Sequence, residues 1–450
     1  MSMKIAVIGS GISGLSAAWL LGRHHSVTVY EAESRLGGHS FTVNAPSPTG
    51  HLPVDMGFIV YNEQTYPNLV AMFETLGVTT RPTNMGFSAS LDEGRIEYGG
   101  DNLVALFSQA RNLVSPRFWS MLRDLVRFYR HAPAHAAALD LESLTLGQYL
   151  DRFGYGEAFQ NDHILPQAAA IWSASAEDIR NYPLVALVRF FENHGLLKIL
   201  GRPMWRTVVG GSRAYVEKLT AQLGGPVCTG RPVTRVKRVA KGVMVTDAGG
   251  NAELYDHVIM ATHADEGLAL LDDVEPEERR LLGAFAYSRN RTVLHSDPAL
   301  MPRRRRTWSA WNYLARTQAG GAQQLCVTYW MNRLQHLPRD RQYFVTLNPI
   351  TEPDPATVVH SEVFTHPIFN AAALRAQPQL WSLQGAGGLW WCGAYFGSGF
   401  HEDGLQAGLA VAEALGGSKR PWQVPQESSR IALGPLSWRQ GSSGQKATVL

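Results

Sequence analysis

Cysteine is scarce in this sequence. Only Cys228, Cys326 and Cys392 occur in 450 residues, and no two of them form a CxxC pair. The sequence therefore predicts neither a disulfide framework nor a zinc site, and it favours a reducing compartment. We also expect no metal site.

Long apolar runs and an excess of one charge are lacking too. No uncharged apolar segment approaches the ~18 residues of a membrane span. Lys and Arg number 41 against 38 Asp and Glu, so no nucleic-acid partner is expected. The opening MSMKIAVIG enters a strand pattern at once, without the features of a signal peptide. These absences favour a cytoplasmic protein, which could still lie peripherally on the inner face of a membrane.

The first motif in the sequence is a glycine-rich turn near the N-terminus. The apolar run KIAVI leads into GSGISG, and an apolar helix pattern and a second strand, SVTVYEA, follow. In such a βαβ unit the glycines permit the tight turn, the approach of a pyrophosphate and close helix packing, while a terminal carboxylate accepts from ribose hydroxyls. The sequence predicts a dinucleotide site formed by Gly9, Ser10, Gly11, Ile12, Ser13, Gly14, Glu31 and Ala32.

A second glycine turn, RLGGHS at residues 35–40, adds a cation that an NAD domain does not need. Together, GxGxxG, the terminal Glu31 and RxGGH resemble the flavin amine oxidase and phytoene desaturase superfamily. The resemblance implies FAD and an α/β fold, with a Rossmann-like FAD-binding domain and an inserted α+β substrate domain. The implied FAD domain is discontinuous, over 1–84, 205–265 and 385–417, with the substrate domain at 85–204 and 266–384. Residues 418–450, rich in Ser, Gly and Pro, predict a mobile tail.

The segment LWWCGAYFGSGFHEDGLQAG at residues 389–408 reads as a strand, a glycine cluster and a helix. A helix beginning near Gly404 would point the N–H groups of Gly404 and Leu405 at the flavin pyrimidine edge, where its dipole stabilises negative charge. The alternative is a surface turn whose acidic residue only caps the helix. The superfamily resemblance completes the predicted FAD contacts with Arg35, Gly37, Gly38, His39, Gly57, Phe58, Val233, Thr262, Gly393, Ala394, Glu402, Asp403, Gly404 and Leu405.

A closer resemblance extends over most of the chain. The stretches DMGFIVYNEQTYPNL, GRPMWRTVVGGSRAYVEKL and CGAYFGSGFHEDGLQAG resemble the FAD-binding N-terminal half of plant cyclopropane fatty-acyl-phospholipid synthases. They also resemble bacterial flavoproteins encoded beside such methyltransferases, including methyl-branched fatty acid desaturases. The resemblance implies that a methylated or cyclopropanated phospholipid acyl chain is dehydrogenated by hydride transfer to flavin N5. It also implies a lipid methyltransferase as partner.

Two other functions remain open from the sequence. One is an oxidase of an amine or of a small cyclic metabolite. The other is a non-catalytic FAD-binding partner of a lipid methyltransferase.

Few residues qualify as the proton acceptor of a flavin enzyme. His295, in RTVLHSDPALMP, ends a predicted strand at about the place where the resemblance puts the lysine of amine oxidases. His401 and Glu402, beside the flavin helix, are the next candidates. Lys198 is the one lysine in a plausible substrate segment, and its neighbours HGLLKIL indicate a surface helix. The residues predicted to line the substrate pocket are Tyr61, Asn62, Trp172 and Tyr329.

Two segments combine arginines with aromatic residues. In SPRFWSMLRDLVRFYR, residues 115–130, Phe118, Leu122, Leu125 and Tyr129 fall on one helical face with arginines opposite. Arg303–Arg306 precede two tryptophans. Both segments are compatible with an anionic membrane surface, and the first equally with a domain helix whose apolar face lies in the core.

Overall fold

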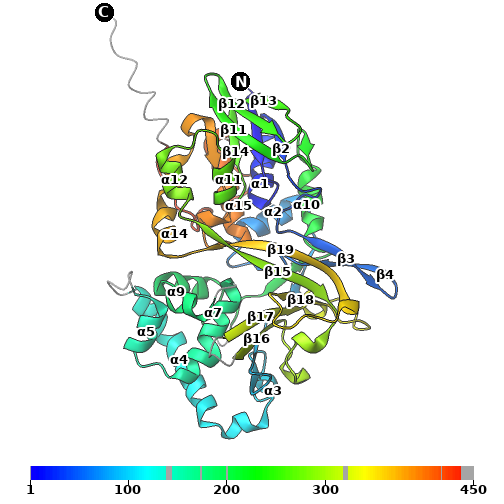
Figure 1. Cartoon of the computed structure of the whole chain (residues 1–450), viewed down its shortest axis with the longest axis vertical. Coiled ribbons are helices and arrows are strands. Elements are labelled where there is room, and N and C mark those ends of the chain that lie inside the picture. The colour runs from blue at the N-terminus through cyan, green and yellow to red at the C-terminus, as the bar shows by residue number, and fades with distance from the viewer. Residues whose placement is uncertain are drawn as a thin grey trace, which may run out of the picture.

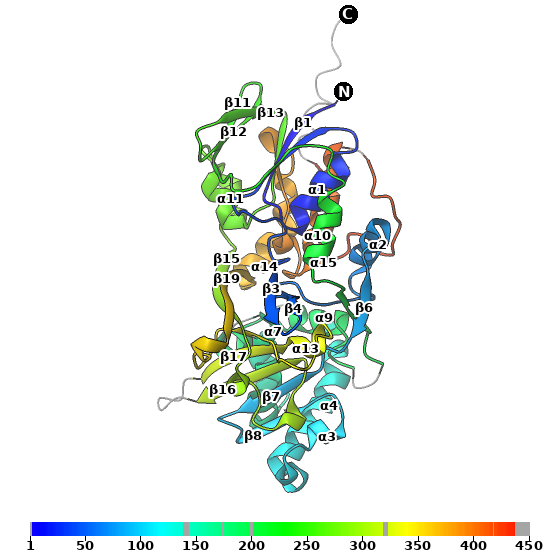
Figure 2. The ribbon, with the colours of Figure 1, turned by 90° about the vertical axis from the view of Figure 1, so that its right-hand side faces the viewer.

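The computed structural model describes residues 2–137, 144–172, 175–198, 201–317, 323–416 and 418–436. Two α/β units follow one another along the long axis of the molecule, and the chain passes between them several times (Figures 1 and 2). This arrangement confirms the predicted α/β fold class.

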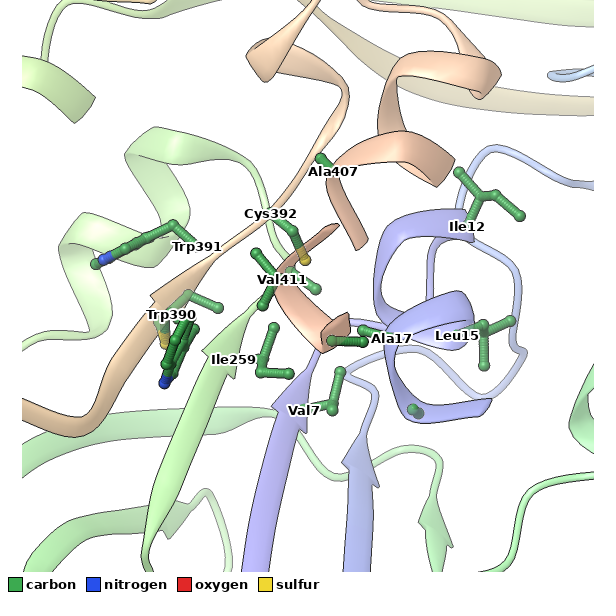
Figure 3. Packing of buried hydrophobic residues seen from close by; sticks show 14 of the residues in the cluster. Val7, Ile12, Leu15, Ala17, Ile259, Trp390, Trp391, Cys392, Ala407 and Val411 are labelled. Carbon is green, nitrogen blue, oxygen red and sulfur yellow. The ribbon is translucent and has the colours of Figure 1, made fainter. Parts of the chain in front are cut away.

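The first unit is built on a five-stranded parallel sheet in the order β10-β2-β1-β14-β20. Its strands are β1 Lys4–Ile8, β2 Ser26–Tyr30, β10 Val227–Cys228, β14 His257–Met260 and β20 Leu389–Trp391. The central strands are apolar because both faces of the sheet are covered, one by helices and the other in part by a three-stranded antiparallel sheet. Figure 3 shows Val7 and Ile259 of the sheet packed against Val411 of α15 (His401–Gly416), beside Ala17 of α1 (Ile12–Leu21).

Other elements surround this sheet. A three-stranded antiparallel sheet carries β11 Val233–Val239, β12 Gly242–Asp247 and β13 Ala252–Tyr255. The helices of the unit also include α2 Pro67–Leu76, α10 Arg213–Thr220, α11 Ala264–Leu270, α12 Pro276–Leu282 and α14 Ala371–Ala376. A hairpin and a small sheet lead to the second unit, with β3 Thr42–Ser47, β4 Gly50–Asp55, β5 Tyr61–Asn62, β6 Thr80–Thr83 and β9 Trp205–Val208.

The second unit is a seven-stranded sheet in the order β19-β15-β18-β17-β16-β7-β8, antiparallel except where β16 pairs with β7. Its strands are β7 Phe87–Leu91, β8 Ile96–Gly99, β15 Ala286–His295, β16 Trp311–Thr317, β17 Gln323–Trp330, β18 Phe344–Leu347 and β19 Val358–Ile368. One face shares a hydrophobic core with a group of helices. They are α4 Pro116–Ala137, α5 Leu146–Arg152, α6 Glu157–Phe159, α7 Leu165–Trp172, α8 Ala176–Arg180 and α9 Leu184–Asn193.

Helix α4 corresponds to the amphipathic segment at residues 115–130, for which the sequence left open a membrane surface or a domain core. Phe118 and Tyr129 are buried in the core together with Met121 and Phe128. The apolar face is therefore the inner face of a domain helix and does not face a membrane. Within the described ranges, no helix combines the length and apolarity that crossing a bilayer would require.

The prediction of a mobile tail is wrong for residues 418–436. Arg420 is only 4% exposed, and its Nε donates to Glu413 Oε1 at 2.7 Å. The ring of Trp422 stacks on Trp19 of α1 with centroids 5.8 Å apart. Composition suggested mobility, but these aromatic and charged side chains fasten the segment to the first unit. Residues 437–450 lie outside the described residues.

Candidate active site

The turn after β1 leaves an open position at the start of α1. Gly9 has φ of 102°, and a Cβ there would lie 2.7 Å from Ala261 O, so this position requires glycine. A Cβ on Gly11 would meet no atom within 4 Å. Helix α1 follows Gly11 without a side-chain cap or an acidic residue in its first turn. Its first N–H groups are therefore available to an anion, as a dinucleotide pyrophosphate requires.

Glu31 lies at the end of β2, beside this turn. Its Oε2 accepts from Ser10 N at 2.9 Å and from Ser10 Oγ at 2.5 Å, and its Oε1 accepts from Glu33 N at 2.9 Å. These donors fix the carboxylate at the carboxyl end of the sheet, where Rossmann-like folds bind the ribose. A carboxylate has about four lone-pair positions, so it can still accept a hydroxyl.

The second glycine turn packs directly on the first. Gly38 has φ of 55°, and a Cβ on it would lie 3.1 Å from Gly11 Cα. Arg35 Nη1 donates to Gly38 O at 2.7 Å, and Phe58 N donates to His39 O at 2.8 Å. The predicted FAD contacts that are partly exposed, together with His401, form a set that we call the cofactor strip: Gly9, Gly11, Glu31, Arg35, Gly38, His39, Gly57, Phe58, Thr262, Ala394 and His401.

The remaining predicted FAD contacts are less accessible or lie outside the strip. Ala32 is exposed at the end of β2. Buried residues of the prediction are Ser10, Ile12, Ser13, Gly14, Gly37, Val233, Gly393, Glu402, Asp403, Gly404 and Leu405. Of these, the glycine-turn residues lie directly under the strip, where their backbone sets its shape.

Helix α15 begins at His401, three residues earlier than the predicted start near Gly404. The N–H groups of Asp403 and Gly404 both donate to Phe400 O, at 3.0 and 3.2 Å. The prediction that Gly404 and Leu405 present free N–H groups is therefore wrong. Asp403 sets the earlier start because its Oδ2 accepts from Phe400 N at 2.8 Å. The N–H groups of His401 and Glu402 occupy the first turn instead.

Glu402 is a structural carboxylate, contrary to its prediction as a proton acceptor. Its side chain is fully buried. Oε1 accepts from Asn68 N at 3.1 Å, Asn68 Nδ2 at 2.8 Å and Gln406 Nε2 at 3.0 Å, and Oε2 accepts from Leu69 N at 3.0 Å. Glu402 therefore caps the first turn of α2, and burial raises its pKa.

His295 ends strand β15, but it points away from the strip. Its Nε2 pairs with Thr346 Oγ1 at 2.8 Å, and its Nδ1 accepts from Asp297 N at 3.2 Å. The adjacent Leu294 points to the opposite face, where it packs in one core cluster with Ile59. Because side chains alternate along a strand, His295 cannot share that face. Its prediction as the base is therefore wrong.

Two histidines lie on the cofactor strip. The His401 ring stacks on Phe58, with centroids 3.9 Å apart, and its Nε2 shares a hydrogen bond with Tyr215 Oη at 2.6 Å. Burial lowers the pKa of His401 to about 3. His39 packs against Phe364 at 5.2 Å, and its Nε2 is buried without a hydrogen-bond partner among the described residues. Burial holds the pKa of His39 well below 6.5, so both imidazoles are neutral at pH 7.

The predicted pocket residues do not form one group. Tyr61 packs edge-on against Phe73 in the core of the first unit. Asn62 Oδ1 accepts from Thr65 N at 2.9 Å and shapes a turn. Tyr329 lies in the second unit, on the sheet face that carries Trp311. The side chain of Trp172 lies outside the described residues.

An aromatic connection that the sequence analysis missed joins the two units. Phe400, directly before α15, stacks on Phe190 of α9 with centroids 4.8 Å apart. His194 stacks on Phe190 at 3.9 Å, and its Nε2 is buried without a hydrogen-bond partner among the described residues. The spacing of Phe190 and His194, four residues apart on one helix face, was the available signal.

Asp55 fixes the loop that leads to Gly57 and Phe58. Its carboxylate accepts from Thr42 Oγ1 at 2.6 Å, Ser212 N at 2.9 Å and Gln335 Nε2 at 2.9 Å. Burial raises its pKa from 3.8 to about 6, although the hydrogen bonds lower it in part. Between about pH 4 and pH 6 the folded state thus holds a proton that the unfolded chain has lost.

We therefore expect Asp55 to make stability fall as the pH rises from 4 to 6, by on the order of 2 kcal/mol, and to contribute no further change above pH 6. Urea unfolding of the wild type and of Asp55→Asn across this range measures the effect. A constant difference between the two proteins at every pH would contradict the assignment.

The fold and the cofactor strip are of the kind that binds a dinucleotide at the carboxyl end of a parallel sheet. Residues 12–286 match the family of flavin containing amine oxidoreductases, and the chain belongs to this family. Membership in this family implies FAD. The space beside Gly11 and the first turn of α1, which has no side-chain cap, fit its pyrophosphate, and the fixed Glu31 carboxylate fits its ribose.

Curated relatives match part of the chain. Flavin-containing amine oxidase A of Canis lupus familiaris is 25% identical over 263 residues, 56% of this chain and 47% of that protein. The L-amino acid dehydrogenase of a Synechocystis strain is 25% identical over 261 residues, 55% of this chain and 54% of that protein. The chain thus spans about half the length of the curated relatives that it matches.

Solved structures match the fold over most of its length. A fatty acid isomerase from P. acnes has a TM-score of 0.64 and 15% identity, covering 92% of this chain and 98% of its own. Cyclohexylamine oxidase from Brevibacterium oxydans has a TM-score of 0.64 and 18% identity, covering 92% of this chain and 100% of its own.

We expect Glu31→Ala to raise the dissociation constant for FAD about ten- to a hundredfold, because charge-assisted hydrogen bonds are lost. Fluorescence titration of the apoprotein with FAD measures the change. Glu33→Ala, two residues away on an exposed site, is the matched control. Equal affinities of the Glu31 variant and the control would remove Glu31 from the ribose site.

Proposed function

We propose that this FAD-dependent oxidoreductase dehydrogenates the acyl chain of a lipid, specifically a methylated or cyclopropanated chain of a phospholipid. One observation carries the proposal. Beside the strip, Phe400 stacks on Phe190, which belongs to the core that contains Trp311 and against which Tyr329 packs. Aromatic side chains are typical of binding sites for apolar ligands.

Sequence resemblance supports the same substrate class. The chain resembles enzymes and flavoproteins that are associated with cyclopropanation and methylation of acyl chains. The fatty acid isomerase from P. acnes, whose fold is similar, is named for an acyl substrate. A lipid methyltransferase would then supply the substrate, since it forms the methylated or cyclopropanated chain.

The residues of this chain have distinct parts in the proposed reaction. Bound at the strip, FAD supplies the two-electron acceptor that C–H oxidation requires. Gly11, Glu31 and the first turn of α1 hold the dinucleotide, and the N–H groups of His401 and Glu402 carry the positive end of α15. His39 is the candidate proton acceptor of the strip, because its imidazole is neutral and its Nε2 has no hydrogen-bond partner among the described residues.

An oxidase of an amine or small cyclic metabolite is the second candidate, favoured by the names of the curated relatives. The lysines argue against the amine oxidase mechanism. Among the described residues, Lys198 is exposed, while Lys4 pairs with Glu253 and Lys237 with Asp272 at the surface. Within the described part of the chain, the cofactor strip therefore has no lysine member.

Anaerobic titration of the flavin spectrum tests the proposal. Cyclopropanated or methylated phospholipid presented in detergent micelles should bleach the flavin absorption, whereas the unmodified phospholipid should not. Micelles remove any need for membrane binding. Bleaching by an amine or a cyclic metabolite alone would establish the second candidate, and a flavin that no compound reduces would contradict both.

A further inference from the structure

Large apolar side chains are exposed together at one end of the second unit. They lie on α3 (Leu103–Leu106), on the 3-10 helix η1 (Ala110–Val114) and on the first turn of α4. Their exposed fractions are 73% for Leu103, 64% for Val104, 53% for Leu113, 81% for Val114 and 50% for Trp119. We call these five residues the tip patch. Soluble monomers rarely expose so many large apolar residues side by side.

The tip patch lies at the end of the long axis opposite the two termini, where α3 and the start of α4 project from the molecule (Figures 1 and 2). Its backbone is fixed. Asn102 Oδ1 accepts from Ala105 N at 2.9 Å and caps α3, and Trp119 Nε1 donates to Leu113 O at 2.9 Å. The apolar side chains are therefore held outward by ordered structure.

The segment that carries the tip patch contains arginines and no carboxylates. Residues 102–123 contain Arg111, Arg117 and Arg123 and no Asp or Glu. Arg117 pairs with Asp162 at 2.7 Å, whereas the Arg123 side chain is 74% exposed beside Asp124. Helix α3 also contacts the turn Arg305–Thr307, so the second arginine cluster of the sequence borders the same patch.

We propose that the tip patch docks the protein on an anionic phospholipid bilayer. Exposed leucine, valine and tryptophan side chains bury area at the headgroup boundary, and neighbouring arginines attract anionic lipids. A second copy of the chain fits less well, because a symmetric contact would bring two arginine rims together. The proposal concerns where the protein binds and does not depend on which compound it oxidises.

Sedimentation of the FAD-loaded protein with vesicles tests the docking. We expect binding to vesicles of phosphatidylcholine mixed equally with phosphatidylglycerol, weak binding to phosphatidylcholine alone, and loss of binding as salt rises. The triple variant Leu103→Ser, Val114→Ser and Trp119→Ser should lower the partition coefficient at least about tenfold. Val114→Ser alone should lower it measurably, because Val114 is the most exposed member of the patch.

Charge and position are tested separately. Arg111→Glu combined with Arg123→Glu should weaken binding to the anionic vesicles. Matched controls are Val239→Ser and Lys241→Glu, whose exposed positions belong to β11 and the turn after it, at the other end of the molecule. Lipids brominated on the acyl chain should quench the fluorescence of the wild type more than that of Trp119→Phe.

Three results would overturn the proposal. The first is vesicle binding that the tip variants leave unchanged, and the second is no vesicle binding at all. The third is a wild type that sediments as a dimer without vesicles and a triple variant that sediments as a monomer, because the patch would then be an interface between copies. A retained flavin spectrum in every variant shows that its fold is intact.

Discussion

Gly14→Ala should lower the free energy of unfolding by about 3 kcal/mol and reduce the FAD content of the purified protein. A Cβ at this position would run into Gly9 O and lie 3.0 Å from Ala261 Cβ. Both neighbours belong to the sheet edge that forms the phosphate turn, and backbone atoms there cannot give way without moving the turn. Chemical denaturation followed by circular dichroism measures the loss of stability, and the visible spectrum measures the flavin.

Gly11→Ala is the matched control, since it makes the same chemical change three residues earlier. A Cβ on Gly11 meets no protein atom within 4 Å, so unfolding should occur at the wild-type denaturant concentration. The methyl group would enter the side of the turn from which a pyrophosphate approaches, and FAD affinity should fall at least about tenfold. If Gly11→Ala binds FAD as the wild type does, the pyrophosphate does not approach at Gly11.

These two glycines illustrate what the sequence could predict. GxGxxG, the carboxylate at the end of the second strand and RxGGH are local patterns that specify the turns and the βαβ unit within one short stretch of chain. The parallel sheet, the open turn and the fixed Glu31 accordingly lie where the sequence indicated. The five-residue pattern of an apolar strand also sufficed to identify β1 and β2.

The errors arose where the deciding contact is distant in sequence. Glu402 reaches Asn68, 334 residues away, and nothing near either residue indicates that the carboxylate caps α2. His295 was placed correctly at a strand end, but which of two faces it occupies depends on the register of β15 with β18. The start of α15 moved because Asp403 folds back on Phe400, and a run of three polar residues offers several equivalent caps.

Arg430→Ala should have the largest effect on stability, a loss of about 3 to 5 kcal/mol, because it leaves a buried carboxylate without its cation. Arg430 Nε donates to Asp403 Oδ1 at 2.5 Å, and the two side chains are 11% and 0% exposed. Arg430 Nη1 also donates to Thr65 O at 2.8 Å, so the residue joins the segment after α15 to the loop before α2. Thermal or denaturant unfolding measures the loss.

The matched control is Arg235→Ala, which removes a surface ion pair with Asp272 whose side chains are 53% and 31% exposed. Exposed ion pairs contribute little to stability, so the losses in the two variants should differ severalfold. The double variant Arg430→Met and Asp403→Asn should recover part of the loss, because it leaves no unpaired buried charge. Equal stabilities of the Arg430 and Arg235 variants would show that Asp403 is not held by Arg430. The start of α15, and with it the His401 N–H group at the cofactor strip, would then depend on the hydrogen bonds from Ser398 and Phe400 alone.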